Sequence, residues 1–394
     1  MGTFNKWRLI LQPNDSSPLQ KYVPTDQHQF RGLFCSKPFK WFEVTGWDQT
    51  KRKGDVFLCC PSWLDVPIGS MESQAVEEIW NSPTAQKLRR SILDGSFEYC
   101  NADRCPFLQT VSGPVQAINE VSDPDLKRVI SENLTVLPYG PREINCSYDK
   151  SCNLSCPTCR TEKIIEIEHE DEILAIQEKL KSQALHDAES IYVTGSGDAF
   201  GSPYFRQLIR TLNPDEMPRL KWIHLHTNGL LWTPENWKRI PERVRALIKT
   251  AEISIDAATP GTYAINRRGG NYEKLLKNLE FIASLRKAGP LESVTISMVV
   301  QENNFQEMVD FVWLGQRFGF DTVYFSQLVN WGTFTDEEYR RRAVHRRDHP
   351  RHSDFIEILN DDIFKELIVY LGNLTEILTK VDAPRGLPQG AIDG

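Results

Sequence analysis

Cys152, Cys156 and Cys159 stand close together near the middle of the chain, with three residues between the first two and two between the last two. Thiolates at such short spacings can each hold one iron of a cubic 4Fe-4S cluster, which leaves the fourth iron without a protein ligand. An open metal position is where chemistry takes place, whereas a site closed by four thiolates is typical of a structural metal. The triplet therefore predicts a reactive iron-sulfur site.

The spacing of the triplet and the Asn153-Leu154 pair inside it resemble the radical S-adenosylmethionine (SAM) enzymes. In that family the amino acid end of SAM binds the fourth iron. The resemblance implies a SAM-binding 4Fe-4S cluster, SAM as a second cofactor, and reductive cleavage of SAM to a 5'-deoxyadenosyl radical. A zinc knuckle is the alternative, but zinc sites normally present two Cys-x-x-Cys pairs or a Cys/His mixture, and no histidine lies near this triplet.

A second set of cysteines precedes the first: Cys35, Cys59, Cys100 and Cys105. Gly54 suits a hairpin turn, and the alternation that follows it predicts a strand that ends near Cys59. A helix that Ser82 can cap and that Pro83 can begin is expected before Cys100. Such elements can bring four thiolates from distant parts of the chain to one metal site.

This second set resembles the SPASM/Twitch module, which carries auxiliary 4Fe-4S clusters in many radical SAM enzymes. The resemblance implies that the four cysteines hold a second, auxiliary 4Fe-4S cluster. The module usually follows the radical SAM domain, whereas here it precedes it, and only enough cysteines for one auxiliary cluster are present. A structural zinc ion on the same four thiolates is the alternative. Cys60 is spare: it could replace Cys59 as a ligand or act as a hydrogen-atom donor, but we expect an inert, small apolar side chain.

Short strands and amphipathic helices alternate from about residue 142, which is typical of parallel β/α units. Strands are expected at 143–148, 190–194, 220–227, 252–256, 293–300 and 321–327. Apolar residues alternate with polar ones in these strands, so one side should lie under helices and the other should be polar. This pattern and the family resemblance predict an α/β fold: a partial (β/α)6 TIM-like barrel with a small N-terminal α+β auxiliary-cluster domain and a helical C-terminal extension.

The domains are expected in this order: an N-terminal arm (1–30), a Twitch/SPASM-like auxiliary cluster domain (31–112), a linker (113–142), the radical SAM partial barrel (143–330), a helical extension (331–380) and a flexible tail (381–394). The basic run over residues 337–352 could meet a phosphate or an acidic peptide. Its acidic neighbours favour a solvated helix face instead.

Loops at the carboxyl ends of barrel strands usually carry the active site. After the second expected strand, Gly195, Gly197 and Asp198 resemble the Gly-Gly-Glu-Pro element of the family, which binds the amino group of SAM. Glycines allow close approach of the backbone, and a carboxylate can accept a hydrogen bond from an ammonium group. Asp replaces Glu here and Ala199 replaces Pro, so backbone carbonyls are expected to supply part of the acceptors.

The resemblance implies further SAM contacts after the later strands, at Asn228, Ser254, Asp256, Arg267 and Val323. Arg267 suits the SAM carboxylate because the planar fork of a guanidinium can bind both oxygens. Arg268 is the alternative if the register differs by one residue.

The composition is that of an ordinary globular protein: 394 residues, of which 40% are apolar and 25% charged. A net charge of -7 argues against a nucleic acid partner. No apolar run approaches the length of a membrane span, and the first residues lack the layout of a signal peptide. Nine cysteines then indicate metal binding rather than disulfides, since the cytosol keeps thiols reduced. We expect a cytoplasmic protein without a membrane partner.

We expect the substrate to be a ribosomally made peptide or a protein side chain, changed by oxidation, cross-linking, bond cleavage or epimerisation. The long connector over residues 113–142 favours a peptide, since it could help to shape a groove. A dehydrogenase or epimerase of a sugar, aminocyclitol or sugar nucleotide is the alternative, and a non-catalytic iron-sulfur or zinc protein is the third. The resemblance also implies an electron donor such as flavodoxin or ferredoxin.

Overall fold

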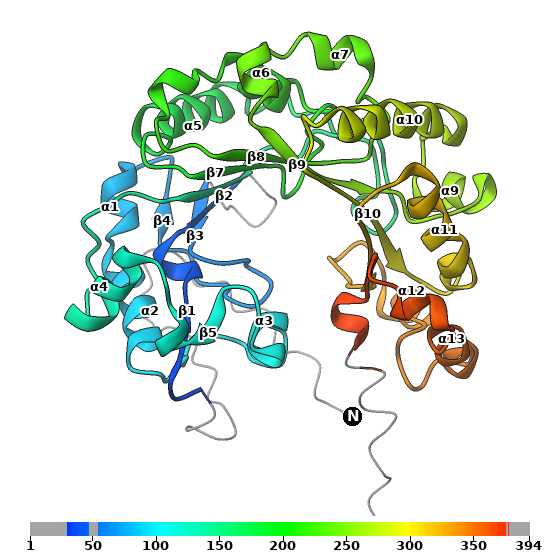
Figure 1. Ribbon diagram of the computed structural model, residues 1–394, viewed down its shortest axis with the longest axis horizontal. Coiled ribbons are helices and arrows are strands. Elements are labelled where there is room, and N and C mark those ends of the chain that lie inside the picture. Colours follow the sequence, from blue (N-terminus) through cyan, green and yellow to red (C-terminus); the bar gives the residue numbers. More distant parts are fainter. Residues whose placement is uncertain (1–29, 47–53, 376, 378–394) are drawn as a thin grey trace, which may run out of the picture. The chain divides into compact units, whose positions relative to one another are not determined.

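The computed structural model describes residues 30–46, 54–375 and 377, which form two compact units (Figure 1). The first unit contains the described residues up to Asp149 together with 168–195 and 213–221. The second contains residues 150–167, 196–212 and those from 222 onward. The predicted arm over residues 1–30, apart from Phe30, and the predicted tail over 381–394 lie outside the described residues.

The N-terminal part of the first unit combines a small sheet with four helices. β1 (Leu33–Cys35) pairs antiparallel with β5 (Val115–Ala117). The helices are α1 (Val76–Trp80), α2 (Pro83–Leu93), α3 (Pro106–Thr110) and α4 (Pro124–Glu132). α2 begins as predicted, because Ser82 Oγ accepts a hydrogen bond of 3.2 Å from the backbone N–H of Ala85. The segment expected as a linker, 113–142, carries β5 and α4.

The larger sheet of the first unit has the strand order β7-β6-β2-β3-β4. Its strands are β2 (Trp41–Thr45), β3 (Asp55–Phe57), β4 (Gly69–Ser70), β6 (Glu143–Ser147) and β7 (Ser190–Val193), and α5 (Glu170–Gln183) connects the last two. β2 pairs parallel with β6, and β6 with β7, whereas β3 and β4 are antiparallel. The cysteine-rich N-terminal region therefore adds a parallel strand, β2, that the sequence did not predict.

The second unit is built from parallel strands in the order β12-β11-β10-β9-β8. They are β8 (Trp222–Thr227), β9 (Ile248–Ser254), β10 (Ser293–Val300), β11 (Thr322–Gln327) and β12 (Val369–Tyr370). The connecting helices are α6 (Pro203–Thr211), α7 (Pro234–Lys238), α8 (Glu242–Arg245), α9 (Pro260–Asn266), α10 (Tyr272–Ala288) and α11 (Met308–Phe318). β9 begins four residues earlier than expected and ends at Ser254, so Asp256 follows the strand.

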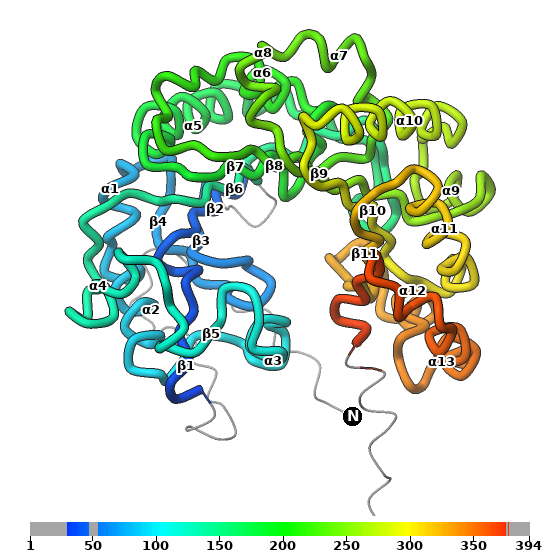
Figure 2. The backbone as a smooth tube through the Cα atoms, viewed as in Figure 1, coloured from blue at the N-terminus to red at the C-terminus, as the bar shows by residue number. Residues whose placement is uncertain are grey.

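Apolar side chains seal one side of these strands. Ile223 and Leu225 of β8 are fully buried, whereas His224 and His226, which alternate with them, are half-buried, as the predicted alternation requires. α10 and α11 run beside β9 and β10 (Figures 1 and 2). α11 packs so closely that a Cβ at Gly315 would stand 2.4 Å from the Val323 side chain of β11. The opposite side of the strands carries the polar residues.

The C-terminal extension contains α12 (Asp336–Arg342) and α13 (His352–Leu359). Its basic residues are largely ion-paired: Arg342 with Glu338 at 2.9 Å, and Arg351 with Glu302 at 3.1 Å. This pairing is what a solvated helix face requires. In the part of the chain that the structure describes, no helix combines the length and the apolar character needed to cross a bilayer.

The predicted fold class is confirmed. The chain is an α/β protein in which the six β/α units of the expected partial barrel are present as β6 to β11, preceded by a small α+β region and followed by a helical extension.

Candidate functional site

The loop after β6 presents the first cysteine set. The backbone N–H of Cys159 and that of Arg160 both donate to the carbonyl of Cys156 at 2.9 Å, which forms a tight turn around the last two cysteines. The N–H of Cys152 donates to the carbonyl of Ile164, also at 2.9 Å. Cys152 and Cys156 are buried and Cys159 is exposed. These hydrogen bonds therefore hold the backbone of the single loop in which the sequence places the three thiols.

Each sulfur of the triplet receives a hydrogen bond from a different side chain. Asn228 Nδ2 lies 3.6 Å from Cys152 Sγ, Arg267 Nη1 lies 3.6 Å from Cys156 Sγ, and Arg160 Nη2 lies 3.3 Å from Cys159 Sγ. Two of the three donors are guanidinium groups. Cationic and amide N–H donors on three thiolates fit an anionic iron-sulfur cluster.

Burial alone would keep the thiols of Cys152 and Cys156 neutral. It raises the pKa of Cys152 to about 12, with the nearby Asp198 carboxylate adding to the effect, and it also raises the pKa of Cys156, against the opposing charge of Arg267. A metal that binds a thiol removes its proton outright. The donor set is therefore suited to a bound metal cluster rather than to free thiolates.

Asp198 ties the loop after β7 to the end of β8. Its Oδ1 accepts from the backbone N–H groups of Phe200 at 3.0 Å and Gly201 at 2.6 Å, and its Oδ2 accepts from Thr227 Oγ1 at 2.9 Å and from the N–H of Asn228 at 2.7 Å. The residue is 1% exposed. Four donors fill the acceptor positions of the carboxylate, so in this structure Asp198 positions the Thr227-Asn228 turn, and Asn228 in turn reaches Cys152.

Replacing Asp198 with alanine is expected to lower the free energy of unfolding by at least about 3 kcal/mol, because buried donors lose their acceptor at a cost of about 1–3 kcal/mol each. Asp198→Asn should cost less, since its oxygen still accepts from the loop N–H groups. Urea unfolding of the two variants and the wild type checks the order. Equal stability of Asp198→Ala and wild type would contradict the positioning role.

Asp256 and Arg267 form a buried ion pair, with Asp256 Oδ2 2.8 Å from Arg267 Nη2. Their side chains are 2% and 11% exposed. Asp256 has a left-handed backbone (φ 58°), and its Oδ1 accepts from the N–H of Val299 at 2.7 Å. Arg267 therefore bridges this carboxylate and Cys156. The structure brings both predicted residues to the triplet and pairs them with each other.

The other residues that the sequence predicts to contact SAM have surroundings unlike those of Asp256 and Arg267. Ser254 lies on the polar side of β9, where its hydroxyl is 2.8 Å from His226 Nε2. Gly195 is required by close packing, since a Cβ there would stand 1.8 Å from Ser147 Oγ. Val323 is fully buried under α11, on the helix-covered side of β11. Val323 therefore does not face a ligand bound on the polar side of the strands.

The second cysteine set gathers in the first unit. Cys100 interacts electrostatically with Cys35, Cys59 and Cys105, so the four thiols occupy one region. Burial raises the pKa of Cys35 to about 12 and that of Cys59 and Cys100 well above the usual value. Within the described ranges, no three His, Cys, Asp or Glu side chains converge as the ligands of a single metal ion do.

Cys59 and Cys60 differ in their surroundings. Cys59 Sγ lies 3.1 Å from the indole nitrogen of Trp63, and the largest Coulombic effect on its pKa comes from Cys35. Cys60 instead lies 3.3 Å from Ser62 Oγ and interacts chiefly with Glu43. The structure thus groups Cys59, and not Cys60, with the other three thiols as a candidate ligand.

Sequence reasoning missed a polar cluster on β2. Glu43 is 8% exposed, and its Oε2 accepts from Trp41 Nε1 at 3.2 Å. Its registered neighbour is Asn145 of β6, and Lys37 Nζ lies 3.2 Å from the centre of the Trp41 ring. These side chains share one side of the sheet with Ser147, five residues before Cys152. The alternation of Trp41, Glu43 and Thr45 with apolar residues was the available signal.

Burial raises the pKa of Glu43, against the hydrogen bonds of Trp41, Asn145 and Ser147 and the charge of Lys37. The folded protein therefore keeps a proton on Glu43 that the unfolded chain releases near pH 4.5. The stability linked to this proton is present at low pH and is lost as the pH rises through the folded pKa.

Glu43→Gln is accordingly expected to gain stability relative to the wild type as the pH rises from 4.5 to 8, because glutamine has no proton to lose. Thermal unfolding of both proteins across this range measures the difference. The control is Glu143→Gln, because Glu143 is a half-exposed residue whose carboxylate is paired with Lys37. A constant difference between Glu43→Gln and wild type would contradict the buried, proton-holding carboxyl.

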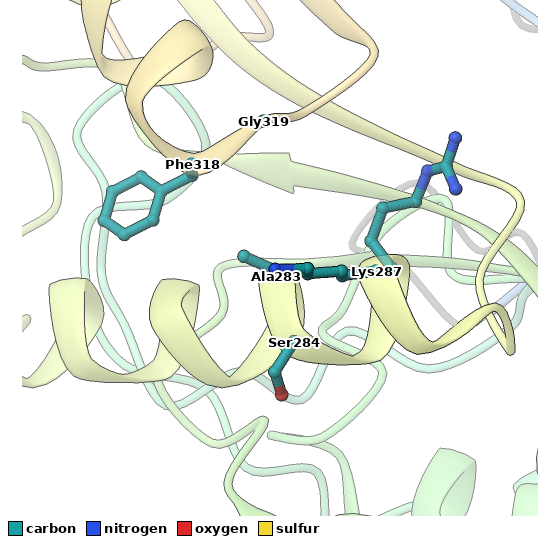
Figure 3. A pocket seen from close by; sticks show the side chains of 6 residues that line it. Ala283, Ser284, Lys287, Phe318 and Gly319 are labelled. Carbon is teal, nitrogen blue, oxygen red and sulfur yellow. The ribbon is translucent and has the colours of Figure 1, made fainter.

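A surface hollow of about 480 Å³ lies elsewhere, beside the ends of α10 and α11 (Figure 3). It is lined by Ala283, Ser284, Arg286, Lys287, Phe318 and Gly319. Arg286 is ion-paired with Asp321: Arg286 Nε lies 2.9 Å and Nη2 lies 2.8 Å from the two carboxylate oxygens. None of the cysteines and none of the predicted SAM residues line this hollow.

Comparison with known proteins agrees with this arrangement. Residues 150–312 match the Radical SAM superfamily, and residues 35–106 match SPASM, an iron-sulfur cluster-binding domain. The fold and the two cysteine sites thus define a two-domain iron-sulfur protein with its SPASM domain at the N-terminal side, as predicted. Residues 150–312 are therefore a radical SAM domain, and residues 35–106 are a SPASM domain.

The individual relatives are distant. The chain is 30% identical to the GTP 3',8-cyclase of Alkaliphilus metalliredigens (strain QYMF) over 135 residues, which is 33% of this chain and 39% of that protein. The chain therefore matches well under half the length of this relative. Streptococcus suis SuiB bound to its precursor peptide SuiA has a TM-score of 0.40 at 11% identity, covering 92% of this chain and 75% of SuiB. TYW1 with a lysine-pyruvate adduct has a TM-score of 0.35 at 15% identity, covering 58% and 72%.

The family match also supports the predicted cofactors. A radical SAM domain uses a 4Fe-4S cluster and SAM, and a SPASM domain binds auxiliary iron-sulfur clusters. The thiols and N–H donors described above fit these groups. The match favours an enzyme over the predicted alternative of a non-catalytic iron-sulfur or zinc protein.

Proposed function

We propose that this protein is a radical SAM enzyme that cleaves SAM reductively and removes a hydrogen atom from a C–H bond of its substrate. The observation that carries the proposal is the set of N–H donors from Asn228, Arg267 and Arg160 to the three cysteines of one loop. When bound there, the cluster supplies the electron that divides SAM into methionine and a 5'-deoxyadenosyl radical.

The residues of the chain then have distinct tasks. Cys152, Cys156 and Cys159 hold the SAM-binding cluster, and Cys35, Cys59, Cys100 and Cys105 hold the auxiliary cluster. Asn228, Ser254, Asp256 and Arg267 form the SAM site, with Gly195 and Gly197 leaving the backbone of their loop accessible. Asp198 acts indirectly, because its carboxylate fixes the turn that carries Asn228.

The substrate that we propose is a ribosomally made peptide or a protein side chain. Support comes from the polar side of the first unit, where the rings of Trp41 and Tyr192 are 4.9 Å apart beside the Glu43 carboxyl and Asn145. Aromatic faces combined with a few hydrogen-bonding groups suit the mixed polar and apolar surface of a peptide. Oxidation with the help of the auxiliary cluster, cross-linking, bond cleavage and epimerisation all start from the same hydrogen removal.

A small polar molecule is the second candidate substrate. The curated relative is named as a cyclase of GTP, which is a nucleotide and not a peptide. This observation favours a dehydrogenase or epimerase of a sugar, aminocyclitol or sugar nucleotide. We place either activity in the cytoplasm, with flavodoxin or ferredoxin as the electron donor.

Anaerobic reconstitution with iron and sulfide, followed by dithionite and SAM, tests the radical chemistry. The expected product is 5'-deoxyadenosine. Its absence from protein that carries both clusters intact would overturn the proposed function.

Isotope transfer separates the two substrate classes. The reconstituted enzyme is incubated with deuterated host extract that has been divided by size, and 5'-deoxyadenosine is examined for deuterium. Label from the peptide and protein fraction is expected. Label that arises only from the small-molecule fraction would reject the peptide proposal in favour of the second candidate.

A further inference from the structure

Arg160, the residue directly after the last cysteine of the triplet, is buried in the cluster loop. The residue is 8% exposed. Its Nη1 donates to the carbonyl of Lys150 at 2.5 Å, and its Nη2 lies 3.3 Å from Cys159 Sγ and 2.8 Å from the carbonyl of Ser196. One guanidinium thus connects the start of the cysteine loop, its last sulfur and the loop after β7.

The main electrostatic partners of the Arg160 guanidinium are cysteine sulfurs. The ionisable groups with the largest effect on it in the structure are Cys159, Cys152 and Cys156. No carboxylate of the described residues has an effect on it as large as these. Since a buried cation needs a compensating negative charge, the compensation here must come from the cluster and its thiolates.

The other guanidinium at the triplet is different. Arg267 also donates to a sulfur, that of Cys156, but its charge is shared with Asp256 at 2.8 Å. The pair Asp256–Arg267 is neutral as a whole, so it offers the cluster a hydrogen bond with little net charge. Arg160 offers a hydrogen bond and a full positive charge.

We propose that Arg160 is a positioning residue that raises the reduction potential of the SAM-binding cluster and holds the Ser196 carbonyl in place beside it. Reduction adds one electron, and therefore one negative charge, to the cluster. A buried cation within hydrogen-bonding distance of a ligand sulfur stabilises the reduced state more than the oxidised one. The inference rests on the proposed function in one respect: a 4Fe-4S cluster is bound at Cys152, Cys156 and Cys159.

The test is a redox titration of the reconstituted full-length protein, followed by electron paramagnetic resonance of the signal that changes when SAM is added. Arg160→Met and Arg160→Gln are expected to make reduction at least tenfold less favourable, a shift of about 59 mV to more negative potential for a one-electron couple. Arg160→Lys keeps the charge and should shift by less than half as much. Iron content should match the wild type in all three variants.

Arg268→Met is the matched control. Arg268 belongs to the same network, with its guanidinium 3.1 Å from Ser155 Oγ, 2.7 Å from the carbonyl of Thr161 and 3.5 Å from that of Arg160. It is exposed, and within the described part of the chain none of its hydrogen bonds goes to a cysteine sulfur. Its removal should loosen the loop without changing the potential. An equal shift in Arg268→Met would show that loop structure, and not the charge of Arg160, sets the potential.

Two further outcomes would overturn the inference: an unchanged potential in Arg160→Met with full iron content, or loss of the cluster from all three Arg160 variants, which would make Arg160 necessary for assembly. The proposed function fails separately. If the wild type holds both clusters but forms no 5'-deoxyadenosine, SAM cleavage is rejected, while the comparison of potentials still decides the role of Arg160.

Discussion

Cys156→Ala is expected to reduce SAM cleavage more than about 100-fold and to remove one 4Fe-4S cluster from the reconstituted protein. Replacing a residue that only hydrogen-bonds to a metal ligand already lowers metal affinity or activity about 10–100-fold. Replacing the ligand itself should lower them further. Cys156 is buried, and its sulfur is the acceptor for Arg267 Nη1 at 3.6 Å. Its loss therefore leaves an iron without a ligand and removes the sulfur acceptor of Arg267 Nη1, while Nη2 keeps Asp256. Iron content and 5'-deoxyadenosine formation are the measurements.

Cys146→Ala is the matched control for this experiment. Cys146 lies on β6, the strand that leads into the cysteine loop, and its thiol is buried on the helix-covered side with a pKa raised by burial to about 12. Removing this small side chain should cost about 1 kcal/mol of stability and leave the iron content unchanged. If Cys156→Ala and Cys146→Ala held the same iron and cleaved SAM equally, the triplet could not be the cluster site.

Much of the fold could be predicted because the physical pattern is local. Alternation in β8 separated Ile223 and Leu225 from His224 and His226, and the structure buries the two apolar residues. The start of α2 followed from the capping chemistry of Ser82. β2 was missed because its alternation extends over only five residues and its parallel partner, β6, lies about a hundred residues further along the chain.

The candidate site was only partly predictable, because side-chain partners depend on tertiary structure. Asp198 was expected to face an ammonium group, but its acceptors are used by backbone and hydroxyl donors of two loops. Because Tyr324 and Phe325 are both aromatic, the sequence does not show which residues of β11 face the helices. The structure places Val323 under α11. Nothing in the spacing of Asp256 and Arg267 indicates that α9 returns the arginine to the carboxylate.

That ion pair carries the second large prediction. Arg267→Met is expected to lower the free energy of unfolding by about 3–5 kcal/mol at neutral pH, because removing one partner of a buried pair leaves an uncompensated charge. Arg286→Met is the control. Arg286 and Asp321 form a well-aligned pair of 2.8 Å at the surface, with side chains 34% and 31% exposed, so its loss should cost at most about 1 kcal/mol.

The pH dependence identifies the cause of the loss. Burial raises the pKa of Asp256, and Arg267 opposes this effect, so Arg267→Met should raise the pKa further. The variant then gains stability from a protonated Asp256 at low pH and loses it as the pH rises through the folded pKa, so its deficit should be small near pH 4 and largest near pH 8. Asp256→Asn combined with Arg267→Met removes the charge and should recover most of the stability, since the asparagine oxygen can still accept from Val299. A deficit that is independent of pH, or a double variant as unstable as Arg267→Met alone, would mean that Arg267 stabilises the fold through its packing and not through the charge of Asp256.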